Sequence, residues 1–359
     1  MASYSGGLPS GPTTSVKTPI EVMFNPKEYT MATAPGVDGG NPASLMTSAA
    51  GVRYIDGAVK LSTSDLQSTG FGIPWGQTRS WGNDPRYTPV NSNGFGWNET
   101  YQPFFLQSSD RRTLVLVTSG SDARYFDVSG TTYTPRFFYQ EQLRQDTGRL
   151  ILTDTIGNQF IFFDFSGPPT LAGKLQGVMD PAGNATVFQY GPDFKLFRVQ
   201  RSDTSGGMTT TEAYQYTYIN GGPNAGLLQN VQLVHQVSGQ AQHLVRQVDY
   251  TYYLPGDHFG NVGDLKTAAI EDGAQPPRVL DKTYYRYYTP GESGGLPHDL
   301  KYVFNPESFA RLGVVVADPF NAPDAQVAPF ADDYYQFDSQ GRVVARAIQG
   351  AGGSDGRGT

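Results

Sequence analysis

A repeated unit constrains this chain more than any other feature: an aromatic strand, a tight turn of Gly, Asp or Asn, and a return strand. Two copies align at Asp-x-x-Gly-Asn, once at Asp154 and again 26 residues later at Asp180. Each copy is strand, turn, strand in its residue pattern, over 150–165 and 177–190. One hairpin alone cannot bury its apolar face, but hairpins stacked in sequence share one sheet. The sequence therefore predicts an array of antiparallel hairpins.

Later units keep this order, although their turns are longer. Alternating tyrosines lead through Gly- and Asp-rich turns into strands that open with Leu, Arg or Val. The last unit, 334–344, is the tightest. The aromatic strands of these later units contain Tyr214, Tyr216 and Tyr218, then Tyr250, Tyr252 and Tyr253, then Tyr284, Tyr285, Tyr287 and Tyr288, and finally Tyr334 and Tyr335.

The composition favours strands and turns over helices. The 359 residues include 43 Gly and 25 Pro, which interrupt helices, and 22 Tyr and 21 Phe, which pack well on a pleated surface. One short helix is expected after Asn305, because Pro306 suits a first helical position. We predict an all-β fold with little helix, in which repeated antiparallel hairpins form a curved or spiralling sheet.

The chain divides into four parts by residue pattern. Residues 1–50 are rich in Gly, Pro, Ser and Thr and are expected to be flexible. Residues 51–150 are a β-rich opening region of the array, and 151–345 are the hairpin array itself. Residues 346–359 have the composition of a flexible Gly-rich tail.

Charge and hydropathy argue against several classes of protein. The formal net charge is −7 with no basic stripe, which argues against nucleic-acid binding. No apolar run approaches the roughly 18–20 residues that span a bilayer, and no signal peptide is visible at the start. The chain has no Cys, which removes disulfides and thiolate chemistry.

No residue pattern specifies catalysis, a cofactor or a metal ion. His235 and His243 lie eight residues apart, and two histidines alone do not specify a metal site. The turn aspartates are explained by hydrogen bonds to their own backbone, with Ca²⁺ binding as the alternative. Asp332 and Asp333 are adjacent, so on a strand they point to opposite faces and make a poor catalytic pair. We expect no catalytic, cofactor-binding or metal-binding residues.

Three tryptophans form the best candidate for a ligand site. Trp75, Trp81 and Trp97 fall within 23 residues, beside Gly and Asn. Exposed aromatic faces stack on the apolar faces of sugar rings. The alternative interpretation, which we favour, is that the three rings seal a hydrophobic core.

The repeated units resemble the YD repeats of the RHS family. The resemblance covers roughly 52–345 and is most specific over 150–200 and 334–344, while Phe194 stands where Gly is usual and the middle units are longer than the family's. The residues that carry it, or that it marks as structural, are Asp154, Gly157, Asn158, Asp180, Pro181, Gly183, Asn184, Tyr190, Tyr335, Asp338, Gly341 and Arg342.

The resemblance implies a spiralling sheet that closes into a hollow shell around a C-terminal toxin, or that forms part of a large surface protein. It implies partners in the remaining repeats or a C-terminal domain of a longer product, and a secreted or cell-surface location. We therefore expect a non-catalytic segment of such a shell. One alternative is a cell-surface module that binds carbohydrate or protein through the tryptophan region. The other is a glycoside-acting enzyme, which needs two carboxylates across a cleft.

Overall fold

The computed structural model describes residues 59, 61–68, 72–83, 92–119, 122–136 and 139–348. The predicted flexible segment 1–50 lies outside the described residues. Of the predicted flexible tail, 346–359, the first three residues belong to the last strand of the structure and the others lie outside the described residues. Among the described residues, no helix is long and apolar enough to cross a membrane.

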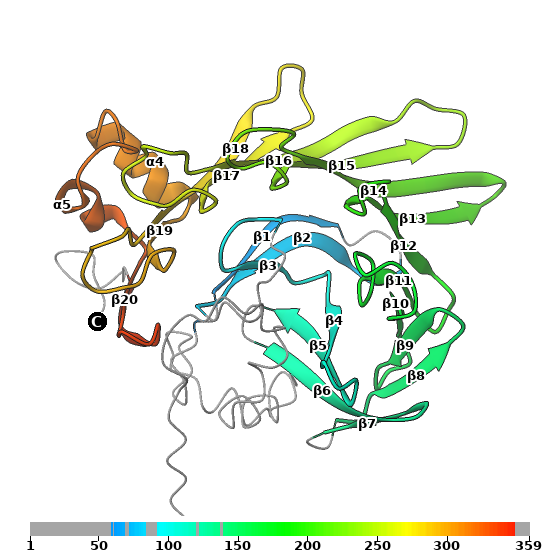
Figure 1. Ribbon diagram of the computed structural model, residues 1–359. Coiled ribbons are helices and arrows are strands. Elements are labelled where there is room, and N and C mark those ends of the chain that lie inside the picture. Colours follow the sequence, from blue (N-terminus) through cyan, green and yellow to red (C-terminus); the bar gives the residue numbers. More distant parts are fainter. Residues whose placement is uncertain are drawn as a thin grey trace, which may run out of the picture.

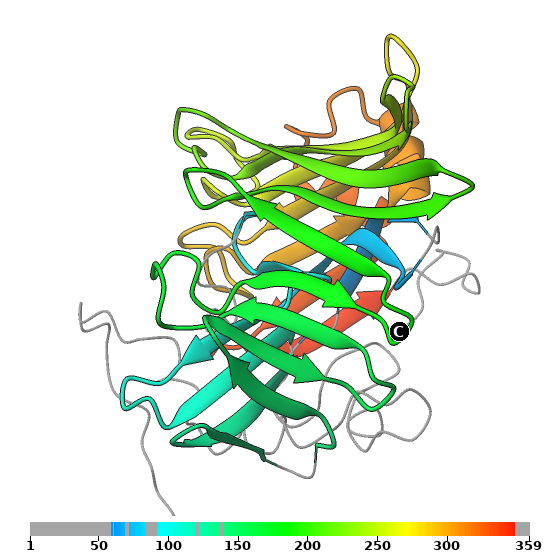
Figure 2. The same ribbon diagram turned by 90° about the vertical axis from the view of Figure 1, so that its right-hand side faces the viewer.

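A single antiparallel sheet of fourteen strands dominates the molecule, and its strands follow one another in sequence order. This confirms the predicted all-β fold. The sheet curves around a concave face in Figure 1, and Figure 2 shows its strands running obliquely, one above the next. Its strands are β8 (Gln142–Asp146), β9 (Arg149–Thr153), β10 (Gln159–Phe163), β11 (Leu175–Met179), β12 (Ala185–Tyr190), β13 (Leu196–Ser205), β14 (Met208–Tyr218), β15 (Leu228–Val237), β16 (His243–Tyr252), β17 (Leu265–Asp272), β18 (Val279–Tyr287), β19 (Leu300–Phe304), β20 (Asp333–Phe337) and β21 (Val343–Ile348).

Two smaller sheets lie inside the curve (Figure 1). The residues predicted as an opening region form them, and the long sheet begins at Gln142, before the predicted boundary at 151. One sheet contains β1 (Leu61–Ser68), β2 (Trp75–Trp81) and β3 (Trp97–Glu99). The other contains β4 (Phe104–Gln107), β5 (Thr113–Ser119), β6 (Asp122–Ser129) and β7 (Thr132–Pro135).

A helical insert interrupts the array between β19 and β20. It contains helix α4 (Pro306–Val315), helix α5 (Asp324–Val327) and a 3-10 turn (Ala328–Phe330). Helix α4 follows Asn305 with Pro at its start, as predicted. The Tyr284 ring packs against Phe304, Phe309 and Phe320, so the insert has a small aromatic core with β18 on the convex side of the sheet.

The same junction recurs along the array. An aromatic residue near the end of one strand pairs with a Leu or Val at the start of the next strand, and the register shifts there by a β-bulge. Bulges increase local twist, so their repetition gives a reason for the curvature of the sheet. The pairs are Phe162 with Leu175, Tyr190 with Leu196, Tyr218 with Leu228, Tyr252 with Leu265, Tyr287 with Leu300, and Phe337 with Val343.

Three of these tyrosines also connect successive units. The Tyr190 hydroxyl donates to the carbonyl of Leu175 at 2.7 Å. The Tyr218 hydroxyl donates to Leu196 at 2.8 Å, and the Tyr252 hydroxyl donates to Leu228 at 2.7 Å. Each bond runs from the end of one strand to the start of the strand before it. The ring thus fills the core while its hydroxyl satisfies a backbone carbonyl, which explains why Tyr recurs at this position.

Candidate functional site

The signature turns have one geometry. In the first, the Asp154 carboxylate accepts hydrogen bonds from the backbone N–H of Asn158 at 2.8 Å and from its side-chain amide at 2.8 Å. The Asp180 carboxylate accepts the same two bonds from Asn184, at 2.9 and 2.7 Å. Gly157 has φ +91°, a conformation that side chains with a Cβ rarely adopt.

The last turn keeps this geometry with a different partner. The Asp338 carboxylate accepts bonds from the backbone N–H of Arg342 at 3.0 Å and from its Nε at 2.7 Å, and Gly341 has φ +71°. Burial alone raises the pKa of Asp338, but the bonds from Arg342 outweigh it and lower the pKa. Asp-x-x-Gly-Asn and Asp-x-x-Gly-Arg are therefore two versions of one carboxylate-closed turn, which accounts for the aspartates without Ca²⁺.

The three tryptophans are buried, with exposed fractions of 5% for Trp75, 1% for Trp81 and 0% for Trp97. Trp75 packs edge-on against Phe188 of β12, and Trp97 packs edge-on against Tyr285 of β18. Trp81 and Trp97 offer no open face to a sugar, so the geometry opposes sugar stacking on these two residues and agrees with the core-sealing interpretation. Trp75 is closed off on the side of Phe188 but borders a pocket on another side. Trp81 and Trp97 are opposite each other in the three-stranded sheet. Trp81 contacts Phe337 and Trp97 contacts Tyr285, so the pair joins this sheet to the concave face of the long sheet.

A charged centre that no sequence motif indicated lies beside Trp97. Arg79 on β2 binds Asp65 on β1 through Nε at 2.5 Å and Nη2 at 2.8 Å. The Tyr250 hydroxyl from the long sheet donates to the same carboxylate at 2.6 Å, and the Arg79 guanidinium lies 4.6 Å from the Trp97 ring centroid. Burial alone lowers the pKa of Arg79, but Asp65 and the surrounding tyrosines raise it well above its usual value.

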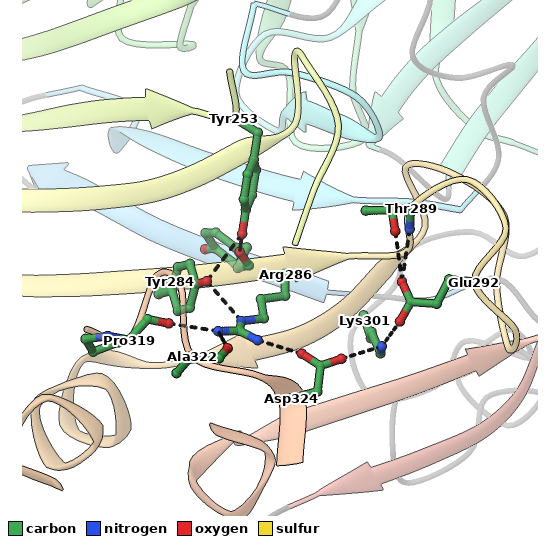
Figure 3. Close-up of polar contacts among 10 residues, drawn as sticks. Tyr253, Tyr284, Arg286, Thr289, Glu292, Lys301, Pro319, Ala322 and Asp324 are labelled. Atoms are coloured by element: carbon green, nitrogen blue, oxygen red, sulfur yellow. Dashed lines mark hydrogen bonds and ion pairs between the residues drawn. The ribbon is translucent and has the colours of Figure 1, made fainter. Parts of the chain in front are cut away.

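A second buried arginine lies on the other face of the long sheet (Figure 3). Arg286 on β18 donates to the carbonyls of Pro319 at 2.8 Å and Ala322 at 2.7 Å, and to the Asp324 carboxylate at 2.6 Å. Its guanidinium also lies 3.7 Å from the Phe259 ring centroid. Pro319 and Ala322 lie outside any helix or strand, and Arg286 provides a hydrogen-bond donor for both of their carbonyls. These bonds hold the helical insert on the convex face of the sheet.

Lys301 extends this network along the sheet. Its ammonium group binds Asp324 at 2.5 Å and also Glu292, whose other carboxylate oxygen accepts from the backbone N–H of Thr289 at 3.1 Å (Figure 3). Burial alone lowers the pKa of Lys301, but the two carboxylates raise it. Each of these four charged side chains therefore has an oppositely charged partner within the protein: Arg286, Asp324, Lys301 and Glu292.

The histidines and the adjacent aspartates singled out in the sequence have other neighbours. His235 and His243 lie directly opposite each other on β15 and β16, with ring centroids 5.2 Å apart. Among the described residues, no three His, Asp or Glu side chains are grouped to hold a metal ion. Asp333 forms an ion pair with Arg346, while Asp332 accepts from the Ser308 hydroxyl, so these adjacent residues have separate partners.

Two carboxylates share a donor on the convex face. The Gln247 side-chain amide donates to Asp249 at 3.1 Å and to Glu271 at 2.7 Å. Burial, with the nearby Glu271, raises the pKa of Asp249. Val248 and Tyr250 face the core, so the alternation along β16 places Asp249 on the opposite, outer face. The two carboxylates therefore lie side by side on this outer face and share the Gln247 donor.

A pocket of about 520 Å³ lies between the two sheets inside the curve and the first strands of the long sheet. Trp75 lies on one wall and Phe160, Phe162 and Val178 on another, and an ion pair between Arg124 and Glu141 forms part of the lining. The sequence drew attention to Trp75 but not to this pocket, because its walls come from seven strands and the segments between them.

No family model matches the chain, and no curated protein matches it. Among solved structures, it is similar to the pore of the Photorhabdus luminescens Tc holotoxin with a mutated TccC3, with TM-score 0.46 and 11% identity over 65% of this chain. A TcdB2–TccC3–Cdc42 structure matches with TM-score 0.35 and 11% identity over 82% of this chain. This chain spans 16% of the length of each of these two.

A porin-like protein from Bacteroides uniformis matches with TM-score 0.28 and 9% identity, over 68% of this chain and 88% of that one. At such identities and TM-scores, none of the three matches shows a function of this chain.

Proposed function

We propose that the chain is a non-catalytic structural segment of an RHS-type β-shell, whose concave face encloses or supports a further part of a longer product. The observation that carries this proposal is the repeated junction of an aromatic residue, a turn and a Leu or Val. It occurs six times in one sheet, with the same bulged register and with tyrosine bonds between units. A unit that contacts chiefly its neighbours builds a wall by repetition.

The buried polar groups also support a structural role. Arg79 and Arg286 each fasten a separate layer to one face of the sheet, and their charges are matched by Asp65 and Asp324. A catalytic role needs groups left reactive in a cleft. The glycoside-acting alternative is not favoured, because Asp249 and Glu271 share a donor on the convex face.

The test uses the complete gene product that contains this array. A protease site is placed in the polypeptide that follows the array, and its cleavage rate is compared with that of the same site in a variant that carries Leu228→Asp. Leu228 is fully buried at a repeat junction, so a charge there disrupts the wall. We expect strong protection that the substitution removes. Equal cleavage in both proteins, or a product with no polypeptide after the array, would overturn the proposal.

A further inference from the structure

We propose that the pocket beside Trp75 binds a neutral amide that carries an aromatic side chain. Its volume of about 520 Å³ falls within the range of small-molecule sites. Its walls come from both inner sheets and from β9 to β12 of the long sheet, so the parts of the fold that define it are held by regular structure. This proposal does not depend on the proposed role in a shell. If the pocket binds no amide, the proposal of a structural repeat array is unaffected.

The apolar walls suit a flat ring. Trp75, Phe160 and Phe162 line the pocket together with Leu116 and Val178. Phe162 is itself held edge-on by Phe105, with ring centroids 4.8 Å apart. Phe162 is fully buried and supports the wall from behind, so a guest ring would contact the half-buried Phe160 and the accessible part of Trp75. Aromatic rings fixed by their neighbours bind a guest ring at little entropic cost, and such pairs prefer offset or edge-on contact.

The polar part of the lining suits an amide. Arg124 and Glu141 form an ion pair, and their side chains are 21% and 12% exposed. The Nε of Arg124 and the Oε2 of Glu141 have no hydrogen-bond partner among the described residues. A buried polar atom without a partner is unfavourable. Both atoms are shielded from solvent, so a guest reaches them only when the two side chains rotate. After that rotation, the C=O and N–H of a single amide would satisfy the unmet donor and the unmet acceptor.

The charges in the pocket favour a neutral guest. The opposite charges of Arg124 and Glu141 neutralise each other. Asp154 also lines the pocket, but its carboxylate accepts hydrogen bonds from Asn158 in its own turn. A charged guest would lose its hydration without gaining a free counter-charge. A sugar is the alternative guest, because the lining also contains threonine and tyrosine hydroxyls, and the controls below distinguish it from an amide.

The three tryptophans make the proposal directly measurable. The chain is labelled with 5-fluorotryptophan, and its three ¹⁹F signals are assigned by single Trp→Phe variants. N-acetylphenylalaninamide is then added. We expect a saturable shift of the Trp75 signal alone, with a dissociation constant on the order of a millimolar for a ligand of this size. Trp81 and Trp97 lie outside the pocket and serve as internal references.

Two ligand controls separate the ring from the amide. N-acetylglycinamide lacks the ring, and N-acetylphenylalanine carries a carboxylate. We expect both to bind at least tenfold more weakly. Equal binding by the carboxylate would overturn the neutral-amide assignment, and a Trp75 shift produced by glucose but not by the amide would replace it with a sugar site.

A matched pair of variants locates the binding. Val178→Phe fills the pocket, whereas Val187→Phe adds the same atoms at an exposed position on β12. We expect the first to abolish the Trp75 shift and the second to retain it, with unchanged Trp81 and Trp97 signals reporting that each variant is folded. No Trp75 shift in the unsubstituted chain, or a shift that survives Val178→Phe, would overturn the proposal.

Discussion

The two faces of β18 each carry a buried arginine site, and the sites differ in how far the paired anion is withdrawn from water. Residues 285 and 287 face inward to Arg79 and Trp97, and residues 284 and 286 face outward to the helical insert. Both guanidinium side chains are fully buried. On the inner face the Asp65 side chain is 2% exposed, whereas on the outer face the Asp324 side chain is 26% exposed.

The partners of the two arginines differ as well. Arg79 is enclosed by side chains from strands far apart in the sequence, so the inner sheet and the long sheet must both be in place before its charge is matched. Arg286 is held largely by backbone carbonyls of a single insert. The inner site therefore joins the three-stranded sheet to the long sheet, while the outer site holds only the helical insert in place. This difference predicts distinct consequences when each is broken.

The largest effect is expected from Arg79→Met. It leaves the Asp65 carboxylate buried without its cation, which typically costs about 3–5 kcal/mol of unfolding free energy. Urea denaturation measures this loss. Arg278→Met is the matched control, because the Arg278 side chain is 78% exposed, and we expect a change within about 0.5 kcal/mol.

A double variant separates the charge from the packing at this site. Arg79→Met combined with Asp65→Leu removes both charges, so much of the lost stability should return. If the double variant is as unstable as Arg79→Met alone, the unpaired Asp65 charge is not the cause of the lost unfolding free energy. The proposed difference between the inner and outer arginine sites would then be wrong.

The next effect is expected from Arg286→Met, at about 2–3 kcal/mol, because two backbone carbonyls lose a donor while Asp324 keeps Lys301 and some contact with water. The effect should be local. Hydrogen exchange of the insert, 306–330, should accelerate, while β1 to β3 stay protected. Equal acceleration in both regions would remove the distinction between a local and a global fastening.

A pH dependence is expected from a carboxyl group in the turn before β19. Burial raises the pKa of Asp299, which precedes β19, to about 7. The folded chain keeps this proton where the unfolded chain, with a carboxyl pKa near 4, has lost it. Stability from this group is therefore present at low pH and falls as the pH rises from about 4 to about 7.

We expect the free energy of unfolding to fall by roughly 2 kcal/mol between pH 5 and pH 7. The limit is about 1.4 kcal/mol per pH unit, and the partial exposure of Asp299 to solvent reduces it. Denaturation across this range measures it. Asp299→Asn keeps an oxygen for the backbone N–H of Leu296 and should flatten the slope. A slope that persists in Asp299→Asn belongs to other groups.

The hairpin array could be predicted from the sequence because residues close together in the chain specify each turn and strand. Asp154, Gly157 and Asn158 specify a turn within five residues, and the observed bonds are those that such a motif can make. The alternation of Tyr with polar residues likewise predicts which face of a strand is buried. The short helix at Pro306 was found for the same reason.

The layers inside the curve could not be predicted in this way. Asp65, Arg79 and Tyr285 meet only after strands more than 200 residues apart are brought together, and no spacing in the chain encodes that contact. The pocket was missed for the same reason. Gly96 shows how closely the inner layer is packed, because it has φ +78° and a Cβ there would lie 2.3 Å from Nε1 of Trp81.

The smallest effect, and the sharpest comparison, concerns salt. Asp324 and Glu292 are 26% and 30% exposed, so dissolved ions can screen the network around Lys301, whereas they have little access to Asp65. The cost of Asp324→Asn should fall by about 0.5 kcal/mol between low salt and 1 M NaCl, and the cost of Asp65→Asn should not change. Urea denaturation of the two variants and the unsubstituted chain at both salt concentrations measures this, because salt effects common to all three proteins cancel in the differences. If both costs fall equally, water reaches both anions alike, and the difference in burial between the two faces of β18 has no electrostatic consequence.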